Sequence, residues 1–186
     1  DAAMAILVAH ISAAAGAMTW MFYEWVKFGK PTALGSVTGM VAGLGTITPA
    51  SGFVGPAGAL VIGIIAGVVC FNAVIIIKQK FKIDDSLDVF PVHGVGGICG
   101  TMLVGFFASK ELGIFSGQGG WSHEAIVISD QLQIQFTAVI ATAAYTALAT
   151  FIILKLVDLV TGLRVDSQTE IQGLDLDSHG EKGYDL

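Results

Sequence analysis

Long apolar segments without charged residues alternate with short charged segments along most of the chain. Four segments lack Asp, Glu, Lys and Arg, and they are Ala2–Tyr23, Pro31–Ile77, Val89–Ser109 and Gln131–Leu154. A helix that crosses the hydrocarbon core of a bilayer needs about 20 such residues. Each segment is long enough for this, so the pattern predicts an all-α polytopic membrane protein.

The second apolar segment is too long for a single crossing, because a helix rises only about 1.5 Å per residue. It contains the sequence TPASGFVGP, Thr48–Pro56, whose prolines and glycines indicate a turn. The turn divides the segment in two, and five membrane spans are predicted. They lie at about 3–26, 32–47, 57–78, 88–108 and 130–162, within a membrane domain 1–163 that precedes a hydrophilic tail, 164–186.

Composition agrees with this class. The chain has 54% hydrophobic and 13% charged residues and a mean hydropathy of +0.76, whereas soluble domains carry about a quarter charged residues. Cys70 and Cys99 both lie in apolar segments, where they read as small hydrophobic side chains and not as a disulfide or metal pair. No cofactor and no nucleic-acid partner are predicted; the predicted surroundings are a lipid bilayer.

The basic residues predict the orientation. With five spans, eight of the nine Lys and Arg residues fall on one face of the membrane, and only Lys110 falls on the other. The positive-inside rule makes the basic face cytoplasmic. The C-terminus is then cytoplasmic, and Thr48–Pro56 and Lys110–Asp130 are external loops.

Two features of the first span complete this picture. Trp20, Tyr23 and Trp25 lie near its predicted inner end, where aromatic side chains favour the membrane interface. Asp1 stands directly before an apolar span with no basic region ahead of it, so the span does not read as a signal peptide. We interpret the sequence as the C-terminal part of a longer membrane protein.

Glycines recur every four residues in three of the predicted spans. The sets are Gly35, Gly39 and Gly43, then Gly63 and Gly67, then Gly96 and Gly100. Small residues at this spacing let helix backbones approach closely in lipid, where little hydrophobic force draws helices together. Helix packing is the predicted role of these glycines.

The sequence DDSLDVFPVHGVGG leads into the fourth predicted span. Asp85 is predicted to cap the helix, with Asp88 at capping-box spacing. Val89 and His93 follow Asp85 at intervals of four and share its face. His93 would lie about 12 Å beyond Asp85, near the middle of a core about 30 Å thick. Pro91 lacks an N–H group, so a kink or opening is predicted just before it.

A histidine at that depth has two interpretations. A charged side chain there costs at least about 2.5–3.5 kcal/mol, so a neutral imidazole with one donor and one acceptor is expected. It could be bonded to a neighbouring helix within the core, or it could line a narrow pathway. The pathway is the usual interpretation of an ionisable residue inside a membrane. Because no metal-ligand spacing or nucleophile–base motif is evident, the chain is not predicted to be an enzyme.

Four segments together resemble the second half of the ammonium transporter (Amt/Mep) family. They are GKPTALG, GLGTITPASGFVGP, DDSLDVFPVHGVGGICG and GLRVDSQTEIQGLDLDSHGEKGY, in this order along the whole chain. The related Rhesus proteins share the His-Gly pair, but the chain lacks their fuller motif. One departure is Pro91, where a glycine is common in the family.

The resemblance implies an eleven-span ammonium channel fold, with two inverted five-span repeats and a final helix, assembled as a homotrimer. These five spans would be the seventh to eleventh. Ammonium is recruited outside and deprotonated, and NH3, or NH3 plus H+, passes through a hydrophobic pore in the cell membrane. The transport serves nitrogen uptake, and methylammonium is an analogue of the substrate.

The same resemblance assigns roles to residues. His93 matches the second of two bridged pore imidazoles, whose partner belongs to a span outside this sequence, and Val89 shares its pore-lining face. Asp85 matches a carboxylate at the inner end of the tenth span. Thr48 matches the threonine of a Thr-Pro turn near the outer vestibule.

The tail has two interpretations. Its composition alone is typical of a flexible solvated segment. The resemblance instead implies a folded cytoplasmic cap, which contacts the neighbouring subunit and assists a PII-type nitrogen-signalling protein. The residues that match the tail motif are Gly173, Asp175, His179, Gly180 and Glu181.

Two other functions remain open for the chain. One is an ammonium sensor with little flux. The other is a proton-coupled secondary transporter of another family. Proteins of the second kind usually use carboxylates near the membrane midplane, and the predicted spans have none there.

Overall fold

A computed structural model describes residues 2–108 and 127–181, which form helices joined by turns, without a strand in these two ranges. The helices are α1 (Ala2–Phe28), α2 (Ala33–Ile47), α3 (Pro56–Ile75), η1 (Ile76–Lys80), η2 (Phe90–Val95), α4 (Gly96–Phe107), α5 (Ile128–Thr161), α6 (Ser167–Gln172) and α7 (Leu174–Asp177). The elements η1 and η2 are π-helices. Contacts divide the chain into two compact units, 1–139 and 140–186.

Helices lie in all five ranges that were predicted to span a membrane, and this confirms the helical class. Four of them are long and apolar enough to cross: α1, α3 with η1, η2 with α4, and α5. The remaining helix, α2, has 15 residues, which give a length of only about 22 Å. The crossing by five helices therefore stays a prediction, as does the division into a membrane domain and a tail.

Two sequence predictions fall partly outside the described ranges. Residues 110–126 belong to the predicted external loop Lys110–Asp130, whose last residues, 128–130, already lie in α5. Residues 182–186 end the predicted tail. The other predicted loop, Thr48–Pro56, does form turns between α2 and α3.

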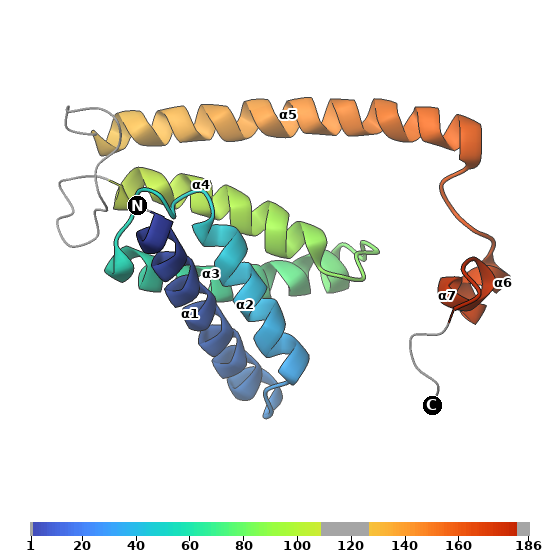
Figure 1. Ribbon diagram of the computed structural model, residues 1–186, viewed down its shortest axis with the longest axis horizontal. Coiled ribbons are helices and arrows are strands. Elements are labelled where there is room, and N and C mark those ends of the chain that lie inside the picture. Colours follow the sequence, from blue (N-terminus) through green and yellow to red (C-terminus); the bar gives the residue numbers. More distant parts are fainter. Residues whose placement is uncertain (1, 109–126, 182–186) are drawn as a thin grey trace. The chain divides into compact units, whose positions relative to one another are not determined.

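Close backbone contact holds the first three helices together. Helix α1 packs against α2 and α3, and Figure 1 shows α1 and α2 side by side. A methyl group added at Gly39 would lie 2.7 Å from the carbonyl oxygen of Gly16, and one added at Gly67 would lie 2.6 Å from Cβ of Thr19. The buried Ser12 hydroxyl also donates to the carbonyl of Gly43 at 2.9 Å. The predicted packing role of these glycines is confirmed.

The aromatic residues of α1 do not form one interfacial belt. Trp20 is only 4% exposed, and its ring meets that of Phe71 edge-on at a centroid distance of 5.2 Å. Tyr23 also packs on Phe71, at 5.3 Å. Trp25 is 64% exposed. The interfacial prediction is therefore wrong for Trp20, because α3 supplies an aromatic partner that no pattern within α1 reveals.

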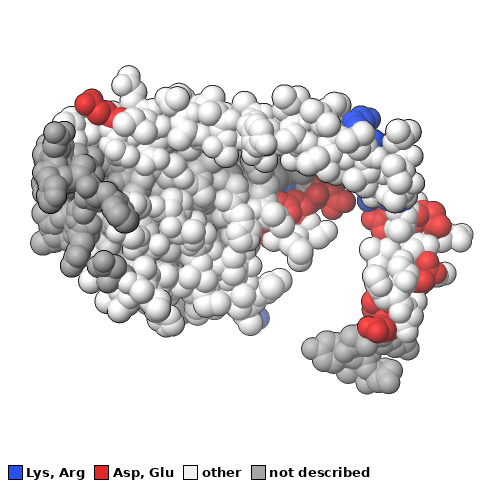
Figure 2. All heavy atoms as spheres, turned by 45° about the horizontal axis from the view of Figure 1, so that its top comes forward, with Lys and Arg blue, Asp and Glu red and all other residues white. Residues whose placement is uncertain are grey.

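Much of the remaining apolar surface is exposed. Helix α5 has no buried residue along its described length of 34 residues, and uncharged side chains make up most of the face drawn in Figure 2. Exposed apolar side chains are the ordinary state of helices that face lipid or other helices of a membrane bundle.

Candidate functional site

His93 lies in η2, a helix with one buried and one exposed face. Pro91 and Val92 are buried in the bundle of the first unit, with Val92 only 2% exposed. His93 and Val89 lie on the exposed face, and Val89 is 51% exposed. η2 turns its other face toward the bundle, so no helix of the described residues covers His93, and its position at mid-depth in a membrane stays a prediction.

The helix that carries His93 begins later than the sequence pattern predicts. Regular helical structure starts at Val89 and not near Asp85, so His93 lies about 6 Å from the helix start along its axis. The predicted depth of about 12 Å assumed helical rise from Asp85, whereas residues 86–87 form a turn before the helix begins. The depth of His93 in a membrane stays a prediction.

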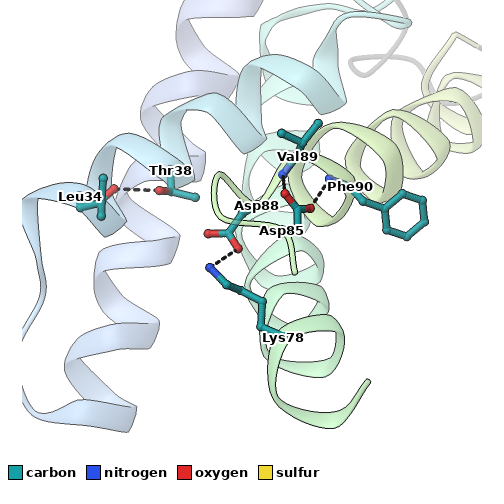
Figure 3. Close-up of polar contacts among 7 residues, drawn as sticks. All are labelled: Leu34, Thr38, Lys78, Asp85, Asp88, Val89 and Phe90. Atoms are coloured by element: carbon teal, nitrogen blue, oxygen red, sulfur yellow. Dashed lines mark hydrogen bonds and ion pairs between the residues drawn. The ribbon is translucent and has the colours of Figure 1, made fainter. Parts of the chain in front are cut away.

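Asp85 does cap this helix, from a position upstream of it. Its two carboxylate oxygens accept hydrogen bonds from the N–H groups of Val89 at 2.9 Å and Phe90 at 2.8 Å (Figure 3). These are two of the donors that the first turn of a helix leaves free. A carboxylate there is also favoured by the positive end of the helix dipole.

The predicted capping box is wrong. Asp88 does not reach back to Asp85 with its side chain; its carboxylate pairs with the ammonium group of Lys78 at 3.0 Å (Figure 3). Asp88 has a φ of +55°, a left-handed conformation that costs a residue other than glycine about 1–2 kcal/mol. The ion pair joins η1 to the residue that directly precedes the His93 helix.

The predicted irregularity at Pro91 takes the form of a π-helix. η2 begins at Phe90, one residue before the proline. Pro91 lies in the first turn of the helix, where its N–H would have no helical partner. The proline therefore removes no hydrogen bond, and π-helical turns of this kind occur often at functional sites.

Helix α2 borders the same region. A methyl group added at Gly45 would lie 3.8 Å from Nδ1 of His93 and 3.6 Å from the carbonyl oxygen of Val92. Thr48 ends this helix, and its exposed hydroxyl donates to the carbonyl of Leu44 at 2.7 Å. Helix α2 thus places Gly45 beside the imidazole, while Thr48 lies about 4.5 Å further along the helix axis.

The sequence profile of the Ammonium Transporter Family matches residues 1–184. The chain belongs to the ammonium transporter family. It is 44% identical over 180 residues to ammonium transporter Amt1 of Archaeoglobus fulgidus, and 42% identical over 180 residues to the ammonium transporter of Bacillus subtilis. Each match covers 97% of this chain and 44% of the relative. The chain thus spans less than half the length of these relatives.

Solved structures of Mep2 and of a Sensor Amt Protein share the fold. Saccharomyces cerevisiae Mep2 is 34% identical and matches with a TM-score of 0.72 over 90% of this chain and 38% of its own. A structure described as a Sensor Amt Protein is 29% identical, with a TM-score of 0.81 over 94% of this chain and 41% of its own. The resemblance to the family is confirmed, and the two sequence relatives are named as ammonium transporters.

The tail of this ammonium transporter family member forms local structure in its described part. Gly173, with a φ of +99°, separates α6 from α7, and Gly180 has a φ of +65°. The N–H of Glu181 donates to the carbonyl of Asp175 at 2.9 Å. His179 lies in the turn after α7. The tail residues named from the sequence therefore build one folded segment, and their regulatory role stays a prediction.

Asp166 caps the start of α6. Hydrogen bonds from the backbone N–H groups of Thr169 and Gln168 lower the pKa of its carboxyl group below the ordinary value. A group with a lowered pKa stabilises the fold above its ordinary pKa, and this contribution disappears as the pH falls through the lowered value. The cap of α6 is therefore intact at neutral pH.

Three residues of interest were not found from the sequence. Lys78 was counted only for orientation, although it pairs with Asp88. Gly45 falls outside the four-residue glycine repeat, and this break in the spacing was a usable signal. Glu24 is 9% exposed and accepts from the N–H of Thr32 at 2.7 Å, at the start of α2. Its position eight residues before Thr32, across a turn, gave no such signal.

Proposed function

We propose that the face with Val89 and His93 lines an ammonium-conducting pathway in the full-length protein. The observation that carries the proposal is the exposed His93 on an uncharged helix face, in a member of the ammonium transporter family. A neutral imidazole offers one donor and one acceptor to a small polar solute. An ammonium ion without water is disfavoured there, because no charged group of the face compensates it.

The proposed pathway carries NH3, or NH3 together with H+, after ammonium is recruited and deprotonated on the external side. A second pore histidine, from a part of the family's fold that this chain does not contain, faces His93. Asp85 supports the pathway by holding the N–H groups of Val89 and Phe90. Thr48 supports the external end from the last turn of α2. The full-length protein is a homotrimer, and its tail engages a PII-type signalling protein.

Uptake by vesicles that contain the full-length protein tests this proposal. We expect uptake of labelled methylammonium that unlabelled ammonium inhibits, without need of an imposed proton gradient. The control is vesicles prepared in the same way without the protein. Uptake that occurs only with an imposed proton gradient would instead favour a proton-coupled transporter.

A second candidate function is ammonium sensing with little flux. It is favoured by the fold match to the structure described as a Sensor Amt Protein. The same vesicles distinguish the two functions, because a sensor binds ammonium but gives methylammonium uptake close to that of vesicles without protein.

We also propose that the end of the bundle with Lys78 and Lys80 is cytoplasmic in the cell membrane. Eight of the nine basic residues support this orientation. A reporter fused after Lys80 should be active only in the cytoplasm, and one fused after Gly119 only outside. The reverse pair of signals would contradict both the orientation and the five-span topology.

A further inference from the structure

We propose that Gly45 is a positioning residue, which sets the space available to the His93 imidazole and thereby the selectivity of the pathway. This inference rests on the proposed role of His93. It concerns a residue of α2 that lies beside the ring and belongs to no repeat of small residues.

The glycines of α2 fall into two groups. Gly39 and Gly43 touch backbone atoms of α1. A methyl group added at Gly39 would lie 2.7 Å from the carbonyl oxygen of Gly16. A methyl group added at Gly43 would lie 2.9 Å from the carbonyl carbon of Ser12. Both distances are shorter than side-chain contacts allow, so helix packing excludes larger residues there. Gly45 lies two residues beyond Gly43, and therefore about 200° around the helix from that seam.

Helix packing does not require a glycine at position 45. An added methyl group would meet its nearest atoms at 3.6 Å and 3.8 Å, which are ordinary contact distances. Alanine also forms helices better than glycine does. The missing side chain at Gly45 leaves room for about one methyl group beside Nδ1 of His93.

The backbone behind His93 is held in place, so crowding at position 45 would act on the ring. Val92 is 2% exposed, and the Cys70 thiol donates to its carbonyl oxygen at 3.9 Å. A methyl group added at Gly96 would lie 2.9 Å from Oγ1 of Thr46 and 3.3 Å from Sγ of Cys70. Thr46 belongs to α2 and Cys70 to α3, so the chain at Val92 and Gly96 packs against both helices. A side chain added at position 45 therefore meets the imidazole, which lies on the exposed face of η2.

The test uses the full-length protein with the variants Gly45→Ala and Gly45→Val. Gly52→Ala is the matched control, because a methyl group added at Gly52 would meet no atom within 4 Å. Methylammonium uptake, with and without K+ as competitor, is measured in vesicles. We expect a fall of about threefold for Gly45→Ala and about tenfold for Gly45→Val, with altered K+ competition, and no change for the control.

A second measurement separates positioning from general damage to the fold. In protein with ¹⁵N-labelled histidine, the Nδ1 resonance of His93, assigned through His93→Gln, should move in Gly45→Ala and stay in Gly52→Ala. An unmoved resonance in Gly45→Ala overturns the inference even if Gly45→Val fails to assemble.

The uptake data also distinguish this inference from the proposed function. If Gly45→Val transports like wild type while His93→Gln does not, the inference on Gly45 is overturned and the proposed function stands. If neither substitution changes uptake or K+ competition, the proposed function and the inference both fail.

Discussion

Replacing His93 with alanine in the full-length protein is expected to lower methylammonium uptake, or to relax discrimination against K+, by about tenfold. The change removes the one polar group that η2 presents on its exposed face beside Gly45. Loss of one hydrogen-bond partner in a desolvated site costs about 1–3 kcal/mol, and each 1.4 kcal/mol corresponds to about tenfold in rate. The measurement is methylammonium uptake with K+ as competitor.

Two further substitutions separate the tasks of the imidazole. His93→Gln keeps a donor and an acceptor but cannot accept and release a proton near neutral pH, so it distinguishes hydrogen bonding from proton transfer. His93→Asp introduces a carboxylate that attracts cations or takes up a proton, so selectivity should change more than in the alanine variant. If all three variants assemble and transport like wild type, His93 is a packing residue and the pathway is wrongly placed.

A second large effect is expected at Gly100, where α4 crosses α2. A methyl group added there would overlap the carbonyl oxygen of Thr46 and lie 2.8 Å from its carbonyl carbon and 3.2 Å from its Cα. These are backbone atoms that cannot rotate away. Gly100→Val should therefore force the two helices apart and destabilise the protein by about 3 kcal/mol or more.

Thermal unfolding and size-exclusion chromatography of the detergent-solubilised protein measure this effect. Gly97→Ala is the control on the same helix, because an added methyl group at Gly97 meets nothing within 4 Å. We expect loss of the assembled species for Gly100→Val and a wild-type profile for Gly97→Ala. Equal stability of the two variants would show that α2 and α4 do not pack as described.

Several features followed from the sequence alone because they depend on local properties. The charge-free segments predicted the helical ranges, since the length and polarity of a segment decide whether it can form an apolar helix. The four-residue spacing of Gly35, Gly39 and Gly43 predicted close packing, which α1 confirms. Asp85 was recognised as a helix cap, because acidic side chains satisfy free N–H groups at a helix start. The motifs were specific enough to indicate the family.

The details of the candidate site depended on contacts between segments that are distant in the sequence. Asp88 was assigned to a capping box, but its carboxylate forms an ion pair with the ammonium group of Lys78 of η1 at 3.0 Å. A charge ten residues away along the chain competes with a local hydrogen bond only when the fold brings it near. The start of η2 at Phe90, after a turn at residues 86–87, was likewise not predicted from the local pattern.

The sequence by itself determined the helical class, the approximate helix ranges and the family, because periodicity, charge and motif spacing are properties of neighbouring residues. Only the tertiary structure decided which side of the His93 helix is exposed, that Trp20 belongs to the core with Phe71, and that Gly45 borders the imidazole. These features depend on how α2 and α3 pack against α1 and η2. Side-chain contacts between helices set that packing, and no single segment of the chain encodes them.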